Sequence, residues 1–267
     1  MSRRKVSGEE TMSVQMPASR TKQALREGRT ALGASMASAS SLMAELMALQ
    51  GFDFVVIDLQ HSESNINDIQ RLVHAVLIGG ANPIVRVPGN DSIMIQRCLD
   101  LGAYGVIVPY VNTVDDAERV VRAAKYPPLG QRSWGPVRGA FYGASDYFQR
   151  ANDELLVVVM LETRQAAENA QAILAVDGVD GCIIGPNDLA ISMGHPSGLP
   201  QVPPDAEENA QRILGAAAEL GKFAGMFCLG TEDASRRLEQ GFRFLNVGGD
   251  ARMAARAAQT VLAELRQ

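Results

Sequence analysis

Eight short segments rich in β-branched and apolar residues recur along this chain between Ala31 and Gly248. Amphipathic stretches with helical spacing separate most of them, for example between Ile66 and Leu77. Eight alternations of strand and helix, each of about 25–30 residues, predict an α/β protein with the (β/α)8 TIM barrel fold. The expected strands are Ala31–Met36, Phe54–Asp58, Pro83–Val87, Gly105–Pro109, Leu155–Leu161, Gly181–Gly185, Phe223–Phe227 and Phe244–Gly248.

The length of 267 residues suits one barrel domain better than two smaller domains. A doubly wound open sheet is the alternative architecture, but no Gly-x-Gly-x-x-Gly sequence follows the first expected strand. Residues 1–18 are polar and show no hydrophobic period, so we expect them to form a flexible leader. The barrel domain is then expected to span residues 19–267.

Charge and composition narrow the partners and the compartment. The formal net charge of −5 argues against nucleic acid or an anionic membrane as a partner. No apolar run reaches the roughly 20 residues that span a bilayer, and the first residues lack the apolar segment of a secretory signal. The three cysteines, Cys98, Cys182 and Cys228, lack metal-ligand spacing and are expected to be buried free thiols. A cytoplasmic location follows as the expectation.

Ionisable residues follow several of the expected strands. Asp58 ends one strand and His61 comes three residues later, while Arg86 stands near the end of the next strand. Glu162 and Asp188 follow the fifth and sixth strands. Because the carboxyl ends of all eight strands meet on one face of a barrel, these side chains are expected to share the face where barrel enzymes place their sites.

Glu162 and Asp188 are candidate metal ligands. They follow strands that are neighbours in a barrel, so their carboxylates are expected to lie close together. An oxygen-rich pair suits a hard or borderline divalent cation such as Mg²⁺ or Mn²⁺, which could polarise a bound carbonyl group. The alternative, of about equal weight on the residues alone, is that both acids only cap helices.

His61 and Arg86 are candidate catalytic residues. An imidazole titrates near neutral pH, so His61 could act as a general base, with Asp58 or Asp100 as the carboxylate that orients it. The alternative for His61 is a solvated loop histidine. A guanidinium at the position of Arg86 could hold an enolate or a carboxylate, and its alternative is a salt bridge to a neighbouring strand.

The distribution of lysine argues against one mechanism of carbonyl chemistry. The chain has four lysines, and none stands at the carboxyl end of an expected strand: Lys5, Lys22, Lys125 and Lys222. A Schiff base formed by lysine is therefore not expected. Chemistry at a carbonyl group would instead need a metal ion.

Taken together, these residues resemble the HpcH/HpaI family of class II pyruvate aldolases, which includes 4-hydroxy-2-oxoheptanedioate and 2-keto-3-deoxy sugar acid aldolases. The resemblance extends from about Thr21 to the C-terminus. The segments that carry it are Gly51–Asp58 with His61, Val85–Val87, Lys125–Arg132, Glu162–Arg164 and Gly185–Leu189. No one of these segments would suffice, but their combination and order are specific.

The resemblance implies reversible retro-aldol cleavage of a 4-hydroxy-2-oxo acid to pyruvate and an aldehyde. It implies a divalent metal ion (Mg²⁺, Mn²⁺ or Co²⁺) held by the residues at Glu162 and Asp188. His61 would move protons through a bound water, and Arg86 would stabilise the pyruvate enolate. The substrate carboxylate would be received by the segment Gly185, Pro186, Asn187 and Asp188. The family pattern also implies a hexamer, a trimer of dimers, with sites near subunit contacts.

Two residues depart from the pattern of family members that cleave dicarboxylic acids. Those members often carry glutamate where this chain has Gln60, and glutamine where it has Met160. The first change removes a charge near His61, and the second makes the pocket more apolar. The aldehyde partner therefore stays open. The alternative functions are a related carbon–carbon lyase, of the oxaloacetate decarboxylase or acyl-CoA ester lyase type, and a catalytically silent barrel that binds an oxo acid.

Overall fold

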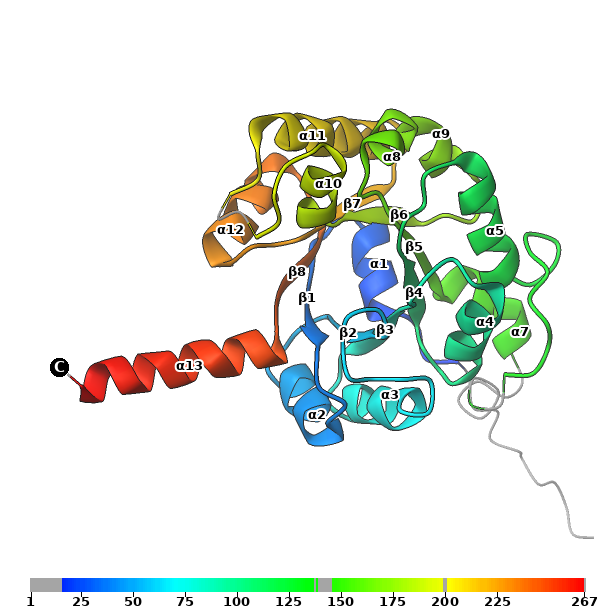
Figure 1. The fold of residues 1–267 in the computed structure, drawn as a ribbon. Helices are drawn as coiled ribbons and strands as arrows, with labels where there is room; N and C mark the ends of the chain where they lie inside the picture. The colour runs from blue at the N-terminus through cyan, green and yellow to red at the C-terminus, as the bar shows by residue number, and fades with distance from the viewer. Residues whose placement is uncertain (1–15, 137, 139–145, 199–200, 267) are drawn as a thin grey trace, which may run out of the picture.

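The structure is a computed structural model that describes residues 16–136, 138, 146–198 and 201–266. Eight parallel strands close into a barrel in chain order, with β8 pairing back to β1 and helices around the outside (Figure 1). The predicted (β/α)8 barrel is therefore confirmed. The strands are β1 (Ala31–Met36), β2 (Phe54–Asp58), β3 (Asn82–Arg86), β4 (Gly105–Val108), β5 (Leu156–Met160), β6 (Gly181–Ile184), β7 (Phe223–Phe227) and β8 (Phe244–Gly249).

Each observed strand begins and ends within one residue of the range predicted from the sequence. The match is close because these runs are buried on both faces and are bounded by turn residues. The described helices are α1 (Arg20–Arg26), α2 (Ser41–Leu49), α3 (Ile69–Ile78), α4 (Ser92–Asp100), α5 (Val114–Ala124), α7 (Tyr147–Glu154), α8 (Arg164–Glu168), α9 (Ala170–Ala175), α10 (Pro186–Ser192), α11 (Pro204–Glu219), α12 (Thr231–Gln240) and α13 (Asp250–Leu265).

Alternate residues of the strands supply two separate apolar layers. Phe54 and Val56 of β2 belong to the layer inside the barrel, whereas Val55 and Ile57 belong to the layer beneath the helices. This explains why the strands read as continuous apolar runs rather than as alternating patterns. Both faces of β2 to β6 are covered, whereas Leu32 of β1 is exposed, so the polar groups of the site project mainly where the strands end.

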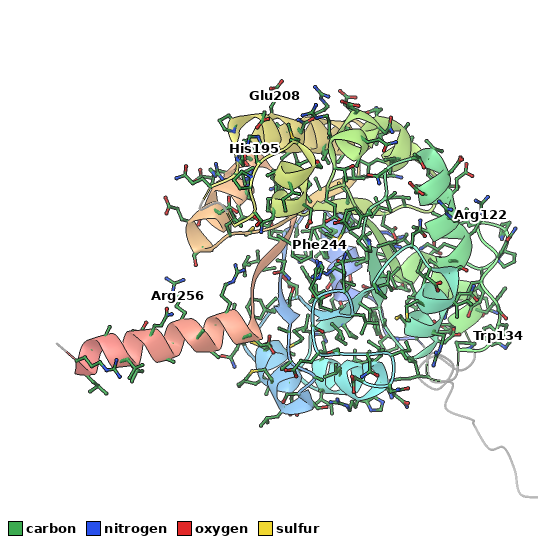
Figure 2. All side chains as sticks on the ribbon, viewed as in Figure 1. Arg122, Trp134, His195, Glu208, Phe244 and Arg256 are labelled. Atoms are coloured by element: carbon green, nitrogen blue, oxygen red, sulfur yellow. The ribbon has the colours of Figure 1, made fainter. Side chains whose placement is uncertain are left out.

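The barrel interior is closed by stacked aromatic rings below the site. Phe54 and Phe244 stack with their ring centroids 4.2 Å apart, and Phe244 lies among the strands in Figure 2. A side chain at Gly33 could not share this space, because a Cβ there would lie 2.2 Å from the Phe54 ring. The interior is thus a packed core, and ligands can approach only from one end of the barrel.

The end of the expected N-terminal leader is packed against the barrel. Met16 is buried, its backbone N–H donates to Asp146, and its carbonyl accepts from Arg150. Of the leader predicted over residues 1–18, residues 1–15 lie outside the described residues. One apolar side chain and two backbone hydrogen bonds thus hold Met16 to the barrel, and the domain boundary at residue 19 stays a prediction.

Helix α13 departs from the regular barrel pattern. It follows β8 but projects away from the barrel into open space (Figure 1). Asp250 at its start is buried, while Val261, Leu262 and Leu265 near its end are exposed apolar residues, Leu265 at 78 %. A helix with an uncovered apolar face has a surface that suits a partner.

Two further expectations concern the thiols and the bilayer. Cys98, Cys182 and Cys228 are all free and buried, as predicted. Within the described ranges, no helix combines the length and the apolar character needed to cross a membrane.

Candidate active site

A cavity of about 460 Å³ opens at the carboxyl ends of the strands. This volume is in the range of sites for small ligands. Its lining includes five of the residues predicted from strand ends, which come from separate parts of the chain: Asp58, His61, Arg86, Gly185 and Asp188. The barrel therefore brings these residues together as expected, while Glu162 lies buried beside Gly185 and Asp188.

Asp58 and Arg86 form a two-pronged ion pair across neighbouring strands. They are register partners at the ends of β2 and β3, so their side chains emerge side by side. Arg86 donates from Nε to Asp58 Oδ1 at 2.8 Å and from Nη2 to Oδ2 at 2.5 Å. Such planar pairing fixes the orientation of a guanidinium as well as its charge. The salt bridge that was the alternative for Arg86 is present, and it does not exclude a role in binding.

Arg86 still presents a free edge to the cavity. Its carbon Cζ lies 5.1 Å from the centre of the Phe227 ring, which contributes a cation–π contact from β7. Within the described part of the chain, its Nη1 group makes no hydrogen bond. One edge of the guanidinium is thus fixed by Asp58, and the remaining donors can receive an anionic ligand.

Asp58 makes no described hydrogen bond to the His61 ring, so its role in orienting that ring stays a prediction. Both oxygens of Asp58 are taken by Arg86, and Oδ1 also accepts from the backbone N–H of Gln60 at 2.9 Å and that of His61 at 3.4 Å. In the described ranges, no carboxylate binds the His61 ring, which is exposed on the cavity wall. The neighbouring Arg86 offers two parallel, charged donors, and such a bidentate pair is stronger than a single hydrogen bond from an imidazole.

Asp100, the second carboxylate predicted to orient His61, makes no described contact with that ring within its own chain, so this role stays a prediction. It is the last residue of α4, and its Oδ1 accepts from Arg132 Nη2 at 2.6 Å. Helices of a barrel run opposite to the strands, so the end of α4 lies at the face remote from the cavity. The order of residues along the chain does not distinguish a helix end from the loop that follows a strand.

Glu162 and Asp188 come together as predicted. Glu162 is only 1 % exposed, and its Oε1 accepts from the backbone N–H of Tyr110 at 2.9 Å. Asp188 Oδ1 accepts from the Tyr110 hydroxyl at 3.3 Å. The pKa of Glu162 is raised to about 7, mainly by burial and also by the negative charge of Asp188, which together outweigh the opposing effects of the Tyr110 N–H and the charge of Arg86.

Helix capping does not explain Glu162. The residue that caps α8 is Thr163, whose hydroxyl accepts from the Ala166 N–H. Asp188 does lie in the first turn of α10, after Gly185 as the N-cap residue, where a negative charge is favourable. The carboxylate of Glu162 is therefore directed at the site rather than at a helix, and only Asp188 retains a helix-end role as well.

The surroundings of the two acids fit a divalent cation. A Cβ at Gly185 would lie 2.6 Å from Glu162 Oε2 and 3.5 Å from Asp188 Oδ2, so both oxygens border the same small space. Over the residues that the structure describes, no group of three or more His, Cys, Asp or Glu side chains could hold a metal. Magnesium is commonly bound through one or two carboxylates, with water and substrate oxygens completing its shell. Glu162 and Asp188 would hold such an ion.

Gly185 can be tested as a spacer between the two acids. Replacing Gly185 with alanine is expected to push the Glu162 carboxylate aside and to weaken Mn²⁺ binding about 10- to 100-fold, as for other losses of a group that orients a metal ligand. Mn²⁺ titration followed by electron paramagnetic resonance measures this. The matched control is Gly215→Ala on α11, where a Cβ meets nothing within 4 Å. Equal Mn²⁺ affinity in Gly185→Ala and wild type would contradict the spacer role.

Three site residues were not predicted from the sequence. Tyr110 follows β4 and contacts both acids; Asp250 follows β8 and accepts from the N–H groups of Ala37 and Ser38 beside the cavity; Phe227 ends β7 and faces Arg86. The rule that polar residues just past strands form the site would have found Tyr110 and Asp250. An apolar ring such as Phe227 carries no such signal. The charge of Asp188 raises the pKa of the Tyr110 hydroxyl, which keeps it protonated as a donor.

The closed barrel and the polar cavity at the carboxyl ends of its strands define a (β/α)8-barrel enzyme. The sequence pattern described as HpcH/HpaI aldolase/citrate lyase matches residues 33–257. The chain belongs to this family, and it is a carbon–carbon lyase.

Proteins of similar sequence and structure match this chain over 90% or more of its length. A hydroxypyruvate/pyruvate aldolase of Rhizorhabdus wittichii is 38% identical over 240 residues, which cover 90% of this chain and 96% of that protein. A 4-hydroxy-2-oxo-heptane-1,7-dioate aldolase of Shigella flexneri is 38% identical over 245 residues, 91% of each chain. The crystal structure of a family protein from Burkholderia cenocepacia superimposes with a TM-score of 0.86 at 32% identity, over 92% of this chain and 98% of that one.

Proposed function

We propose that the protein is a divalent-metal-dependent aldolase that cleaves a 4-hydroxy-2-oxo acid to pyruvate and an aldehyde. One observation carries the proposal: the acid pair Glu162–Asp188 and the free edge of Arg86 belong to the same end of one barrel. The names of the similar aldolases support the same reaction. A bound cation would polarise the carbonyl group of the oxo acid as a Lewis acid.

The reaction needs negative charge to be stabilised on an oxygen. When the bond between C3 and C4 breaks, its electron pair moves to C3 and the enolate of pyruvate forms. Arg86 is held by Asp58 in one orientation, and its Nη1 donors can hydrogen-bond the enolate oxygen. Because the guanidinium is fixed before substrate binds, it needs no reorganisation as the charge develops.

Two protons must also move. The hydroxyl proton on C4 leaves as the aldehyde carbonyl forms, and C3 of the enolate takes up a proton to give pyruvate. We assign this transfer to His61, acting through a water molecule, since the exposed ring lines the cavity and no described carboxylate holds it elsewhere. Microscopic reversibility gives His61 the opposite task in the condensation direction.

The substrate carboxylate is assigned to the first turn of α10. Gly185 is its N-cap residue and Pro186 has no N–H to donate, so the available amides are those of Asn187 and Asp188. All four residues line the cavity. This segment would fix one end of the oxo acid and leave the aldehyde end toward the outer cavity.

The first experiment is pyruvate release from a panel of racemic 4-hydroxy-2-oxo acids, with EDTA and with added Mg²⁺, Mn²⁺ or Co²⁺. Release that depends on metal is expected, and the ranking of rates identifies the aldehyde and the preferred ion. Oxaloacetate and acyl-CoA esters in the same panel test the related lyases. No turnover with any substrate, together with no Mn²⁺ binding, would point to a silent barrel instead.

The protein is also proposed to assemble, because α13 has an apolar face that its own chain leaves uncovered. Val261, Leu262 and Leu265 lie on one side of the helix, and Arg256 and Thr260 on the other. Helix α2 exposes a second apolar stripe, formed by Leu42, Leu46 and Leu49. Exposed stripes of this kind suit contacts between copies of one chain. We propose that they contribute to the dimer contacts of a hexamer, a trimer of dimers.

If copies of the chain assemble through α13, a charge on the apolar face of this helix is expected to weaken the assembly. Leu262→Glu is expected to lower the particle mass, because it places a charge in an apolar contact, which light scattering after gel filtration measures. Thr260→Glu, on the opposite face of α13, is the matched control and should leave the mass unchanged. An unaltered mass in Leu262→Glu would remove α13 from the proposed interface.

Two coarser features complete the proposal. We propose a single catalytic barrel domain, preceded by a leader whose residues 1–15 lie outside the described part of the chain. A cytoplasmic location is supported by three buried free thiols, which suit a reducing compartment.

A further inference from the structure

Tyr110 combines a strained backbone with contacts to both acids. Its φ angle is +54°, and among the described residues no other non-glycine residue has a positive φ. This left-handed conformation is uncommon for bulky side chains. Glycine would adopt this conformation without strain. A tyrosine here is therefore explained by what its ring and hydroxyl contact, and not by the backbone conformation. Strain of this kind is retained where a site uses it.

The neighbouring chain holds Tyr110 in this conformation. Its carbonyl accepts from the side chain of Asn112 at 3.2 Å, and the N–H of Val111 donates to the Met160 carbonyl at 3.3 Å. Thr163, next to Glu162, donates its hydroxyl hydrogen to Asn112. The turn after β4 is thereby fastened to the segment that carries Glu162, and the position of Tyr110 relative to the acid is set by several bonds at once.

The contacts of Tyr110 divide the four carboxylate oxygens into two sets. Its N–H binds Glu162 Oε1 at 2.9 Å, and its hydroxyl lies 3.3 Å from Asp188 Oδ1. The two oxygens that it leaves free, Glu162 Oε2 and Asp188 Oδ2, are the ones that border the space at Gly185. One residue therefore engages one oxygen of each acid, while the other oxygen of each borders the space beside Gly185.

We propose that Tyr110 is a positioning residue for the metal ligands, which holds Glu162 and Asp188 so that one free oxygen of each is directed to the cation. This inference rests on the proposed metal-dependent function and deepens it. The backbone N–H orients Glu162, and the hydroxyl orients Asp188, which is the less buried of the two acids and has no other described side-chain partner. Because Tyr110 is 50 % exposed, its side chain serves contact with the acid rather than packing in the core.

The test separates the hydroxyl from the backbone. Tyr110→Phe keeps the ring and removes the hydroxyl, and it is expected to weaken Mn²⁺ binding about tenfold, the lower end of the range for groups that orient metal ligands. Tyr110→Gly keeps the N–H, relieves the strain and is expected to weaken Mn²⁺ binding at least as much while the thermal midpoint rises or holds. Tyr104→Phe is the matched control, since that hydroxyl contacts the Pro17 carbonyl; its Mn²⁺ affinity should equal that of wild type.

Electron paramagnetic resonance of Mn²⁺ reads the outcome without turnover. Wild-type affinity in Tyr110→Phe would overturn the positioning role, and so would a wild-type protein that binds no Mn²⁺. Binding that is weakened by Tyr110→Phe in a protein that releases no pyruvate would support the positioning role and refute the aldolase proposal. The two failures are therefore distinguishable.

Discussion

Glu162→Gln is expected to lower metal-dependent pyruvate release by about 10³-fold or more. The change removes the ionised oxygen that would face the cation, and Lewis-acid stabilisation contributes several kcal/mol, with each 1.36 kcal/mol worth about tenfold in rate. Glutamine keeps the shape of the side chain and can still accept the Tyr110 N–H through its carbonyl oxygen. Pyruvate release at saturating Mg²⁺ and Mn²⁺ titration measure the two effects.

The variant is expected to stay folded, because the raised pKa of Glu162 makes the ionised carboxylate a cost to the stability of the wild-type protein at high pH. The folded-state pKa of Glu162 is raised from 4.5 to about 7 by burial, so the folded state binds the proton more tightly. In metal-free wild type, this stabilisation is complete below about pH 4.5 and is lost as pH rises through about 7. Glutamine cannot ionise and escapes that loss.

The metal-free thermal midpoint of Glu162→Gln at pH 8 is therefore expected to equal or exceed that of wild type. Glu168→Gln, an exposed acid on α8, is the matched control for both measurements and should behave as wild type. Wild-type turnover in Glu162→Gln after chelation and metal restoration would remove Glu162 from the metal site.

Arg86→Lys is expected to lower the rate constant kcat by about 10²- to 10³-fold while Mn²⁺ affinity stays within a few-fold of wild type. Lysine retains the positive charge but cannot bind Asp58 with two parallel donors and still present a third to the substrate. Loss of one donor aimed at a developing oxyanion has an effect of this size. Steady-state rates and Mn²⁺ titration separate chemistry from metal binding.

Lysine is the better test than alanine because Asp58 is buried. Removing one partner of a buried ion pair typically destabilises a protein by about 3–5 kcal/mol, so Arg86→Ala could lose activity through unfolding. The matched control is Arg71→Lys on α3, because the Arg71 side chain is half-exposed in its ion pair with Asp68. A rate equal to wild type in Arg86→Lys would refute the assignment of the enolate to Arg86.

The strands and their ends were open to prediction from local pattern alone. Apolar runs buried on both faces have a clear signal, and a residue just past such a run must emerge at the carboxyl face of a barrel. That reasoning located Asp58, His61, Arg86, Glu162 and Asp188. It did not place Asp100, which ends α4, because a helix end and a strand end can look alike in sequence.

Pairing within the site needed the tertiary structure. The register that sets Asp58 opposite Arg86 depends on hydrogen bonds between strands about 30 residues apart, and it places the Asp58 carboxylate against the guanidinium. Tyr110 acquires its role from a left-handed backbone conformation that its residue type disfavours.

The sequence by itself determined the eight-stranded barrel, the face that carries the polar residues and the resemblance to metal-dependent aldolases, since hydrophobic period and residue type are local properties. The tertiary structure alone decided which charges pair, which oxygens of Glu162 and Asp188 remain free, and that α13 projects from the barrel. Each of these depends on distances between segments far apart in the chain, and packing fixes those distances only when the barrel closes.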